Sequence, residues 1–174
     1  EAAMESVRAQ SYDNWLCFVL SNGNKNTPRT PNGSFDVIKN TAARDRRFIV
    51  VNKRKNDLRM YFRMLCHLAD CFPHSYLCTL DADDEYAPDF FQRGLALAKA
   101  HDLDIVACGT DIIAKKQAGD QEGRLLAQRQ VKEDLIIASE GFTEQFPVYK
   151  PFFNEMWGKL FQAKLLRRKN YEQY

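Results

Sequence analysis

Hydrophobic residues follow two alternating patterns along the chain: short continuous runs, and longer stretches in which they recur every third or fourth position. Short runs bounded by polar or turn-forming residues are typical of strands buried on both faces. Four such runs cover Trp15–Leu20, Phe48–Val51, Tyr76–Leu80 and Asp104–Cys108. We therefore expect four buried strands, the first of which ends in the turn-forming sequence Ser21-Asn22-Gly23-Asn24.

Helical spacing separates these runs. The clearest stretch extends from Asp57 to Cys71 and stops before Pro73, which cannot continue a helix. Its apolar positions are Leu58, Tyr61, Phe62, Leu65, Leu68 and Ala69. A second helix is expected from about Phe35 to Thr41, because Ser34 is a suitable N-cap.

A third helix is expected around Pro88, which fits a first helical turn and is followed by Phe91, Leu95 and Ala98 on one face. Strands that alternate with amphipathic helices favour an α/β fold, with a mostly parallel sheet covered on both faces. We expect a single domain over residues 1–174.

The second half of the chain is less regular. Residues Lys115–Lys132 are polar and include two glycines, so they are expected to form an exposed loop. Ile136–Phe146 and Met156–Leu166 are expected to form shorter helical or mixed elements.

Composition narrows the class of protein. The chain has 174 residues, 45% of them hydrophobic, and a net charge of +2, so neither disorder nor a nucleic-acid partner is expected. No apolar run approaches the roughly 18 residues of a membrane span. The five cysteines have no C-x-x-C spacing, and we expect buried, reduced thiols in a cytoplasmic protein.

The densest chemical feature is an acidic cluster directly after the third expected strand. Asp81, Asp83, Asp84 and Glu85 place four carboxylates within five residues. In an open parallel sheet, ligands bind at the carboxyl ends of the strands. Two aspartates one residue apart can reach one hard cation such as Mg²⁺ or Mn²⁺, although a solvated acidic turn before a helix is the simpler alternative.

Two other aspartate-rich motifs fit poorly. A calcium-binding EF-hand loop that began at Asp81 would need glycine and glutamate where Tyr86 and Gln92 stand. A phosphatase of the haloacid dehalogenase type would place its motif near the first strand and follow it with a small hydroxyl residue, whereas Glu85 stands there.

Basic residues precede the acidic cluster. Eight lie between Arg44 and Arg63, against only two aspartates. Arg59 and Arg63 share one helix face at i, i+4 spacing. A metal ion together with guanidinium groups would suit a diphosphate, although most of these basic residues are also compatible with a solvated surface.

Five segments in order resemble motifs of the family 2 glycosyltransferases. They are Glu5–Trp15, Asp45-Arg46-Arg47-Phe48, Leu80–Asp89, Leu103–Val106 with Gly109, and Trp157-Gly158-Lys159-Leu160-Phe161. The resemblance covers nearly the whole chain. It implies a GT-A-like (Rossmann-like) fold and inverting transfer of a sugar from a nucleotide donor, commonly UDP-linked, to a glycan or glycoconjugate acceptor.

The resemblance also implies roles for individual residues. Asp83 would ligate a Mn²⁺ or Mg²⁺ ion together with Asp81, which would also face the donor, and Asp84 would be a supporting carboxylate. Arg63, with Arg59 on the same helix face, would contact the nucleotide. Asn22 is the donor contact expected at the end of the first strand, where the family usually has an aspartate.

Three departures from the family pattern accompany these matches. The chain begins after the family's usual first strand, and the first strand here ends without a carboxylate. The acidic pair that usually supplies the catalytic base is expected beyond Tyr174. We therefore expect a chain incomplete at both ends, with membrane association only through other segments at the inner membrane face. A non-catalytic domain that binds sugars or partner proteins is the alternative to an enzyme, and a metal-dependent phosphohydrolase is a third possibility.

Overall fold

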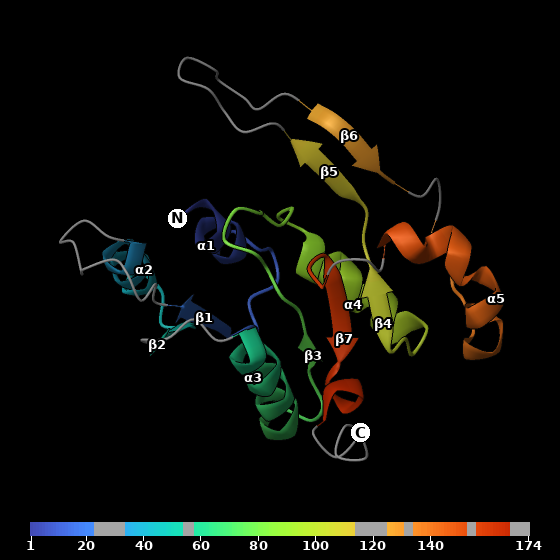
Figure 1. The fold of residues 1–174 in the computed structure, drawn as a ribbon, viewed down its shortest axis with the longest axis horizontal. Helices are drawn as coiled ribbons and strands as arrows, with labels where there is room; N and C mark the ends of the chain where they lie inside the picture. The colour runs from blue at the N-terminus through green and yellow to red at the C-terminus, as the bar shows by residue number, and fades with distance from the viewer. Residues whose placement is uncertain (23–33, 54–57, 114–124, 131–133, 153–155, 168–174) are drawn as a thin grey trace.

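The computed structural model describes residues 1–22, 34–53, 58–113, 125–130, 134–152 and 156–167. The helices of these residues are α1 (Ala2–Arg8), α2 (Ser34–Ala42), α3 (Leu58–Cys71), α4 (Phe90–Ala100), α5 (Ser139–Tyr149), and the 3₁₀ turns η1 (Lys150–Phe152) and η2 (Ala163–Leu166). The strands are β1 (Cys17–Asn22), β2 (Phe48–Lys53), β3 (Tyr76–Leu77), β4 (Ile105–Ala107), β5 (Thr110–Ile113), β6 (Leu125–Arg129) and β7 (Lys159–Gln162). Figure 1 shows their arrangement.

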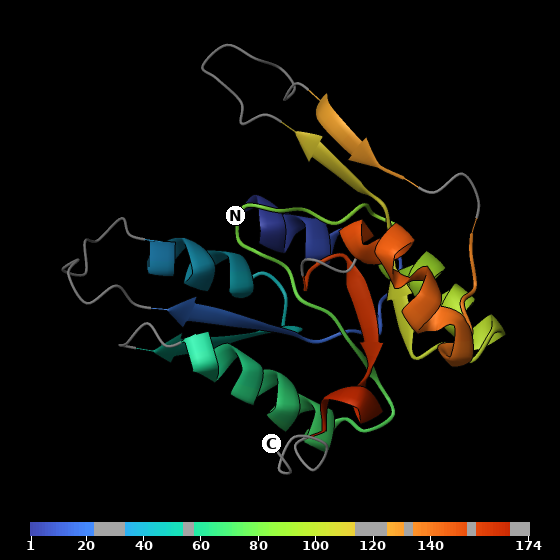
Figure 2. The same ribbon diagram turned by 45° about the vertical axis from the view of Figure 1, so that its right-hand side comes forward.

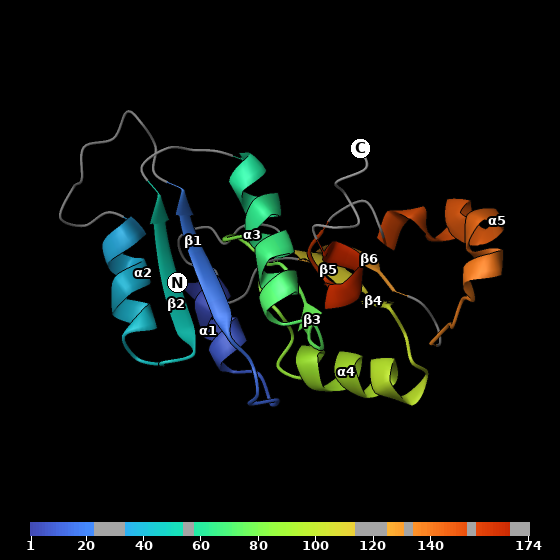
Figure 3. The same cartoon turned by 90° about the horizontal axis from the view of Figure 1, so that it is seen from below.

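The first two strands form a parallel pair. Cys17 lies opposite Phe48, and the register continues to Asn22 opposite Lys53. Figure 3 shows this pair between α2 and α3. Both strands and both helices lie where the apolar runs and the helical spacing predict them, with ends that differ by one or two residues.

The second sheet is antiparallel, which corrects the expectation of a mostly parallel arrangement. Its strand order is β3-β7-β4, and β7 pairs antiparallel with both neighbours. Tyr76 lies opposite Gln162, and Val106 lies opposite Leu160. An apolar run indicates that a strand is buried but carries no information on its direction, and β7 comes from much later in the chain than the strands that it joins.

The third sheet is a hairpin of β5 and β6, in which Thr110 lies opposite Arg129. The hairpin projects from the rest of the fold (Figures 1 and 2). β6 lies inside Lys115–Lys132, so the prediction of a loop there was wrong for Leu125–Arg129, whereas residues 114–124 and 131–133 lie outside the described part. Leu125–Gln128 are all exposed, so β6 lacks the alternation of buried and exposed positions that indicates a strand.

The core joins α1, α4 and the sheets. Its buried hydrophobic members are Met4, Val7, Phe48, Tyr86, Phe90, Phe91, Ala98, Val106 and Leu160. Of the apolar positions predicted for the third helix, Phe91 and Ala98 are buried and Leu95 is half-buried. The two segments expected to be helical or mixed contain α5, and β7 with η2. No helix within the described ranges is long and apolar enough to cross a membrane.

Candidate functional site

The acidic cluster lies in a turn a few residues after the end of β3. The backbone N–H of Asp84 donates to the carbonyl of Asp81 at 3.2 Å, which closes the turn. The hydroxyl of Tyr86 donates to the carbonyl of Thr79 at 2.6 Å, so a buried hydrogen bond joins the two sides of the acidic segment. The carboxylates therefore sit on a short, internally bonded segment.

Helix α1 and the residues after it hold the far side of this turn. The side chain of Gln10 donates to the carbonyl of Ala87 at 2.6 Å and accepts from the N–H of Phe91 at 3.0 Å. The hydroxyl of Ser6 accepts from the N–H of Tyr86 at 3.1 Å. Because Gln10 is 5% exposed, these bonds are sheltered from water and fix the acidic turn to both α1 and α4.

The three aspartates differ in exposure. Asp81 and Asp83 are exposed, whereas Asp84 is half-buried. Burial, and then the negative charges of Asp83 and Asp81, raise the pKa of the Asp84 carboxyl. A cation that neutralised this cluster would relieve that repulsion.

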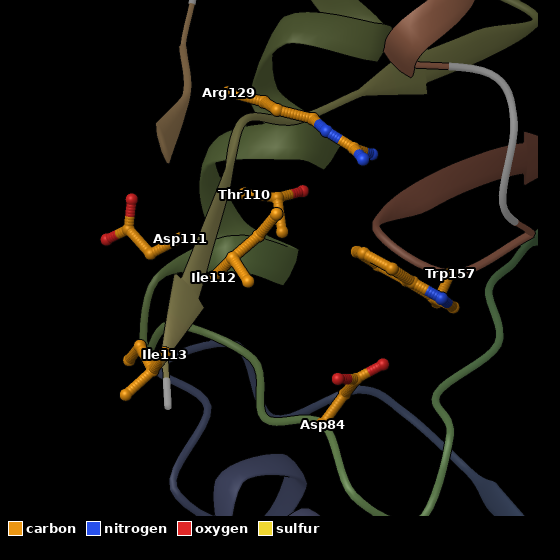
Figure 4. Close-up of a pocket in the computed structure, with 7 residues that line it drawn as sticks. All are labelled: Asp84, Thr110, Asp111, Ile112, Ile113, Arg129 and Trp157. Carbon is orange, nitrogen blue, oxygen red and sulfur yellow. The ribbon is translucent and has the colours of Figure 1, made fainter. Parts of the chain in front are cut away.

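Asp84 lines a cleft of about 280 Å³. Its lining residues are Asp84, Thr110, Asp111, Ile112, Ile113, Arg129 and Trp157. Figure 4 shows the Trp157 ring and the Arg129 guanidinium directed into this space, with the Asp84 carboxylate below them. The cleft therefore combines the acidic turn, the β5–β6 hairpin and the segment before β7.

Trp157 has a fixed backbone. Its carbonyl accepts from the Lys159 ammonium at 3.2 Å, and Lys159 is 3% exposed. The next residue, Gly158, has a φ of 68°, a conformation that other residues rarely adopt. The Gly158 carbonyl accepts from both the N–H and the thiol of Cys108, at 3.0 and 3.2 Å, which ties this segment to the end of β4.

The predicted donor contact Arg63 does not line this cleft. Arg63 is exposed and lines a different cavity, of about 860 Å³. The remaining lining of that cavity is mainly apolar and comes from α3, β4, β7, η2 and Met156. The side chains of Arg59 and Asn22 lie outside what the structure describes.

Three residues near the acidic turn escaped prediction. Thr110 and Arg129 belong to the β5–β6 hairpin, whose sequence lacks the hydrophobic pattern that predicts a strand. Tyr61 of α3 is near the turn: its side chain bonds to Thr79, and the nearby charge of Asp81 helps burial to raise its pKa. Tyr61 was expected on the apolar face of its helix, but its spacing did not indicate a polar neighbour.

The donor chemistry of the turn suits a hard divalent cation. Carboxylate oxygens are the ligands that Mg²⁺ and Mn²⁺ prefer, and such ions take only one or two carboxylates beside substrate phosphates and water. Asp81, Asp83 and Asp84 supply carboxylates of this kind at the turn. Over the described residues, however, no group of three or more His, Cys, Asp or Glu side chains is arranged so that it could hold a metal ion.

The family described as Glycosyl transferase family 2 matches residues 1–171. The chain therefore belongs to the family 2 glycosyltransferases, and its α/β fold is of the GT-A type. Comparison with curated proteins finds no match.

Proposed function

We propose that this domain transfers a sugar from a nucleotide-sugar donor, UDP-linked and held with a divalent cation, to a glycan or glycoconjugate, with inversion at the anomeric carbon. One observation carries the proposal. Asp84 of the acidic turn and Trp157 of the Trp-Gly-Lys-Leu segment lie far apart in sequence and line one cleft. Both segments resemble motifs of the family.

Each carboxylate has a role in this proposal. Asp83 and Asp81 would hold the cation from the exposed part of the turn, and Asp84 would add its charge from the cleft side. When bound, the cation would neutralise negative charge on the leaving diphosphate. The hydrogen bonds of Tyr86 and Gln10 hold the turn, so the carboxylates need little rearrangement when donor binds.

The first experiment measures binding of UDP to the 174-residue chain by calorimetry, with and without Mn²⁺. We expect tight binding only with Mn²⁺. Asp83→Asn and Asp84→Asn should each weaken it at least tenfold. Asp89→Asn is the matched control, because Asp89 is an exposed aspartate that lies outside the turn and pairs with Arg93 at 3.6 Å. It should change binding by less than twofold. UDP binding that is indifferent to the metal and to all three substitutions would overturn the proposal.

A non-catalytic domain that binds sugars or partner proteins is the second candidate. It is favoured by the absence of a carboxylate at the end of β1, where Ser21 and Asn22 stand. Release of UDP from UDP-sugars in the presence of acceptor distinguishes the two. Turnover that depends on Mn²⁺ and Asp83 supports the enzyme, and metal-dependent binding with no release of UDP supports the binding domain.

A further inference from the structure

We propose that the cleft between the acidic turn and the β5–β6 hairpin binds one neutral pyranose ring, stacked on the indole of Trp157. This inference rests on the proposed function, because it names the part of the sugar substrates that the cleft would take. Its physical basis is the size of the cleft, the orientation of its side chains and the mixture of their charges.

Size limits the ligand to about one ring. The cleft has a volume of about 280 Å³, just below the roughly 300–1,000 Å³ of pockets that enclose drug-sized molecules. A complete nucleotide sugar, with a base, two pentose or hexose rings and a diphosphate, exceeds this space. The nucleotide must therefore extend outside the cleft, and a single monosaccharide unit can enter it.

The walls present one apolar face and one polar face. Figure 4 shows Thr110 and Ile112 on the side of β5 that faces the Trp157 ring, whereas Asp111 points away from it. A pyranose has C–H groups on one face of its ring, and these pack against the electron-rich face of an aromatic side chain. Trp157 and Ile112 could therefore enclose the ring.

The polar groups suit hydroxyls better than a charged ligand. Asp84 accepts hydrogen bonds, Arg129 donates them, and the Thr110 hydroxyl does both. A sugar hydroxyl can donate to the carboxylate and accept from the guanidinium, so a neutral polyol satisfies all three. An anionic ring would be repelled by Asp84, and a cationic one by Arg129.

Contacts fix the Arg129 side chain and the backbone of Trp157 before any ligand arrives. Nη1 of Arg129 donates to the carbonyl of Pro151 at 3.3 Å. The segment of Trp157 is fixed by the Lys159 and Cys108 contacts described above. Such support lowers the entropy cost of ordering a binding site.

The experiment uses three probes on the whole chain: UDP with Mn²⁺, a set of UDP-hexoses with Mn²⁺, and the corresponding methyl glycosides alone. Trp157→Ala removes the aromatic platform, and Ile112→Trp fills the cleft. Both are compared with Arg93→Gln, a control on the exposed surface of α4. Thermal unfolding checks that each variant is folded, and Trp157→Phe keeps an aromatic face if Trp157→Ala fails to fold.

We expect both cleft variants to bind UDP within twofold of the native chain. At least one UDP-hexose or methyl glycoside should bind to these variants at least ten times more weakly than to the native chain. Trp157→Phe should keep part of the native affinity for that probe. Loss confined to UDP-hexoses assigns the ring to the donor, and loss confined to methyl glycosides assigns it to the acceptor. Either result supports the proposal.

Two results would overturn the pyranose site. One is that both cleft variants bind every sugar probe as tightly as the native chain does. The other is that the native chain binds UDP-hexoses no more tightly than UDP and does not bind methyl glycosides. Equal weakening of UDP binding and sugar binding in the cleft variants would also overturn it, because the cleft would then bind the nucleotide. A native chain that binds methyl glycosides through Trp157 but does not bind UDP with Mn²⁺ would support the pyranose site while contradicting the proposed function.

Discussion

The hydroxyl of Tyr86 donates to the carbonyl of Thr79 across the base of the acidic turn, at 2.6 Å. Thr79 lies in the segment after β3, and Tyr86 directly follows Glu85, the last carboxylate of the turn. The bond therefore joins the two ends of the acidic segment. Burial raises the pKa of the Tyr86 phenol, so the hydroxyl keeps the proton that it donates. The Tyr86 ring also stacks on Phe90 with centroids 4.4 Å apart, which links the turn to the core.

Tyr86→Phe should therefore keep the ring packing and remove the hydroxyl, with its bonds to the Thr79 carbonyl and to the Cys78 thiol. The Thr79 carbonyl would lose a sheltered donor, which costs about 1–3 kcal/mol of unfolding free energy. The turn should also loosen, and UDP binding with Mn²⁺ should weaken several-fold if the turn holds the cation. Chemical denaturation and calorimetry measure the two effects. Tyr12→Phe, in a half-buried tyrosine outside the turn, is the control.

The pair of Asp45 and Arg47 should make stability depend on acid pH. Hydrogen bonds from the Arg47 side chain and backbone, followed by its charge, lower the pKa of Asp45 to about 2. Because an unfolded aspartate titrates near pH 3.9, the stabilisation is complete above about pH 4 and is lost as pH falls toward 2. Asp45→Asn should lower the melting temperature at neutral pH, and the difference from the native chain should shrink between pH 4 and 2.

Melting temperatures at several pH values test this prediction. Asp13→Asn is the control, because Asp13 contacts Arg47 at 3.2 Å but its side chain is 93% exposed. It should have a smaller effect. A difference between Asp45→Asn and the native chain that stays constant from pH 7 to 2 would contradict the assignment to ionisation.

A close approach between α4 and β7 predicts a strong packing effect. A Cβ atom at Gly94 would lie 2.5 Å from Cδ1 of Leu160, which is 3% exposed. Gly94→Val should therefore destabilise the fold by about 1–3 kcal/mol through overpacking. Ala96→Val, on the exposed side of the same helix, introduces a comparable β-branched residue without this clash and should cost only a few tenths. Equal denaturation midpoints for the two variants would contradict the predicted contact.

The cysteines should react with thiol reagents at very different rates. Cys71 is exposed and the other four cysteines are half-buried, which corrects the expectation of buried thiols. Burial raises the pKa of Cys17 to about 12 and that of Cys78 to about 11. At pH 8 a thiol with a pKa near 11 is ionised to roughly one part in a thousand. Cys71→Ser should remove the fastest phase of labelling by Ellman's reagent, whereas Cys78→Ser should leave that phase intact.

Sequence patterns predicted the elements whose own residues carry a buried face. α3 and the strands β1 and β2 were found because their apolar spacing or continuity is local. β3 was predicted to reach Leu80, but its ladder includes only Tyr76 and Leu77, which pair with Gln162 and Phe161 of β7. An apolar run indicates burial, whereas the extent of pairing depends on a partner strand that lies far away in sequence.

The candidate site was predicted in part for the same reason. The acidic turn follows the apolar run that contains β3, so its position could be expected from local sequence. Arg129 and Thr110 reach the cleft through the hairpin, whose exposed residues give no periodic signal. Arg63 was expected to contact the nucleotide, and that role stays a prediction; the structure shows the exposed Arg63 lining the apolar cavity, because the direction of a helix face depends on packing with β7 and η2.

The position of β7 between β3 and β4 also bears on biosynthesis. During translation, both earlier strands leave the ribosome before Lys159–Gln162 are made, an interval of about 3–10 s at roughly 5–20 residues per second. Through that interval the nascent chain carries strand edges that have not met their native partner, and such edges invite pairing with other chains. Yield of folded protein should therefore rise with extra holdase chaperone, which would cover these edges until the last strand closes the sheet.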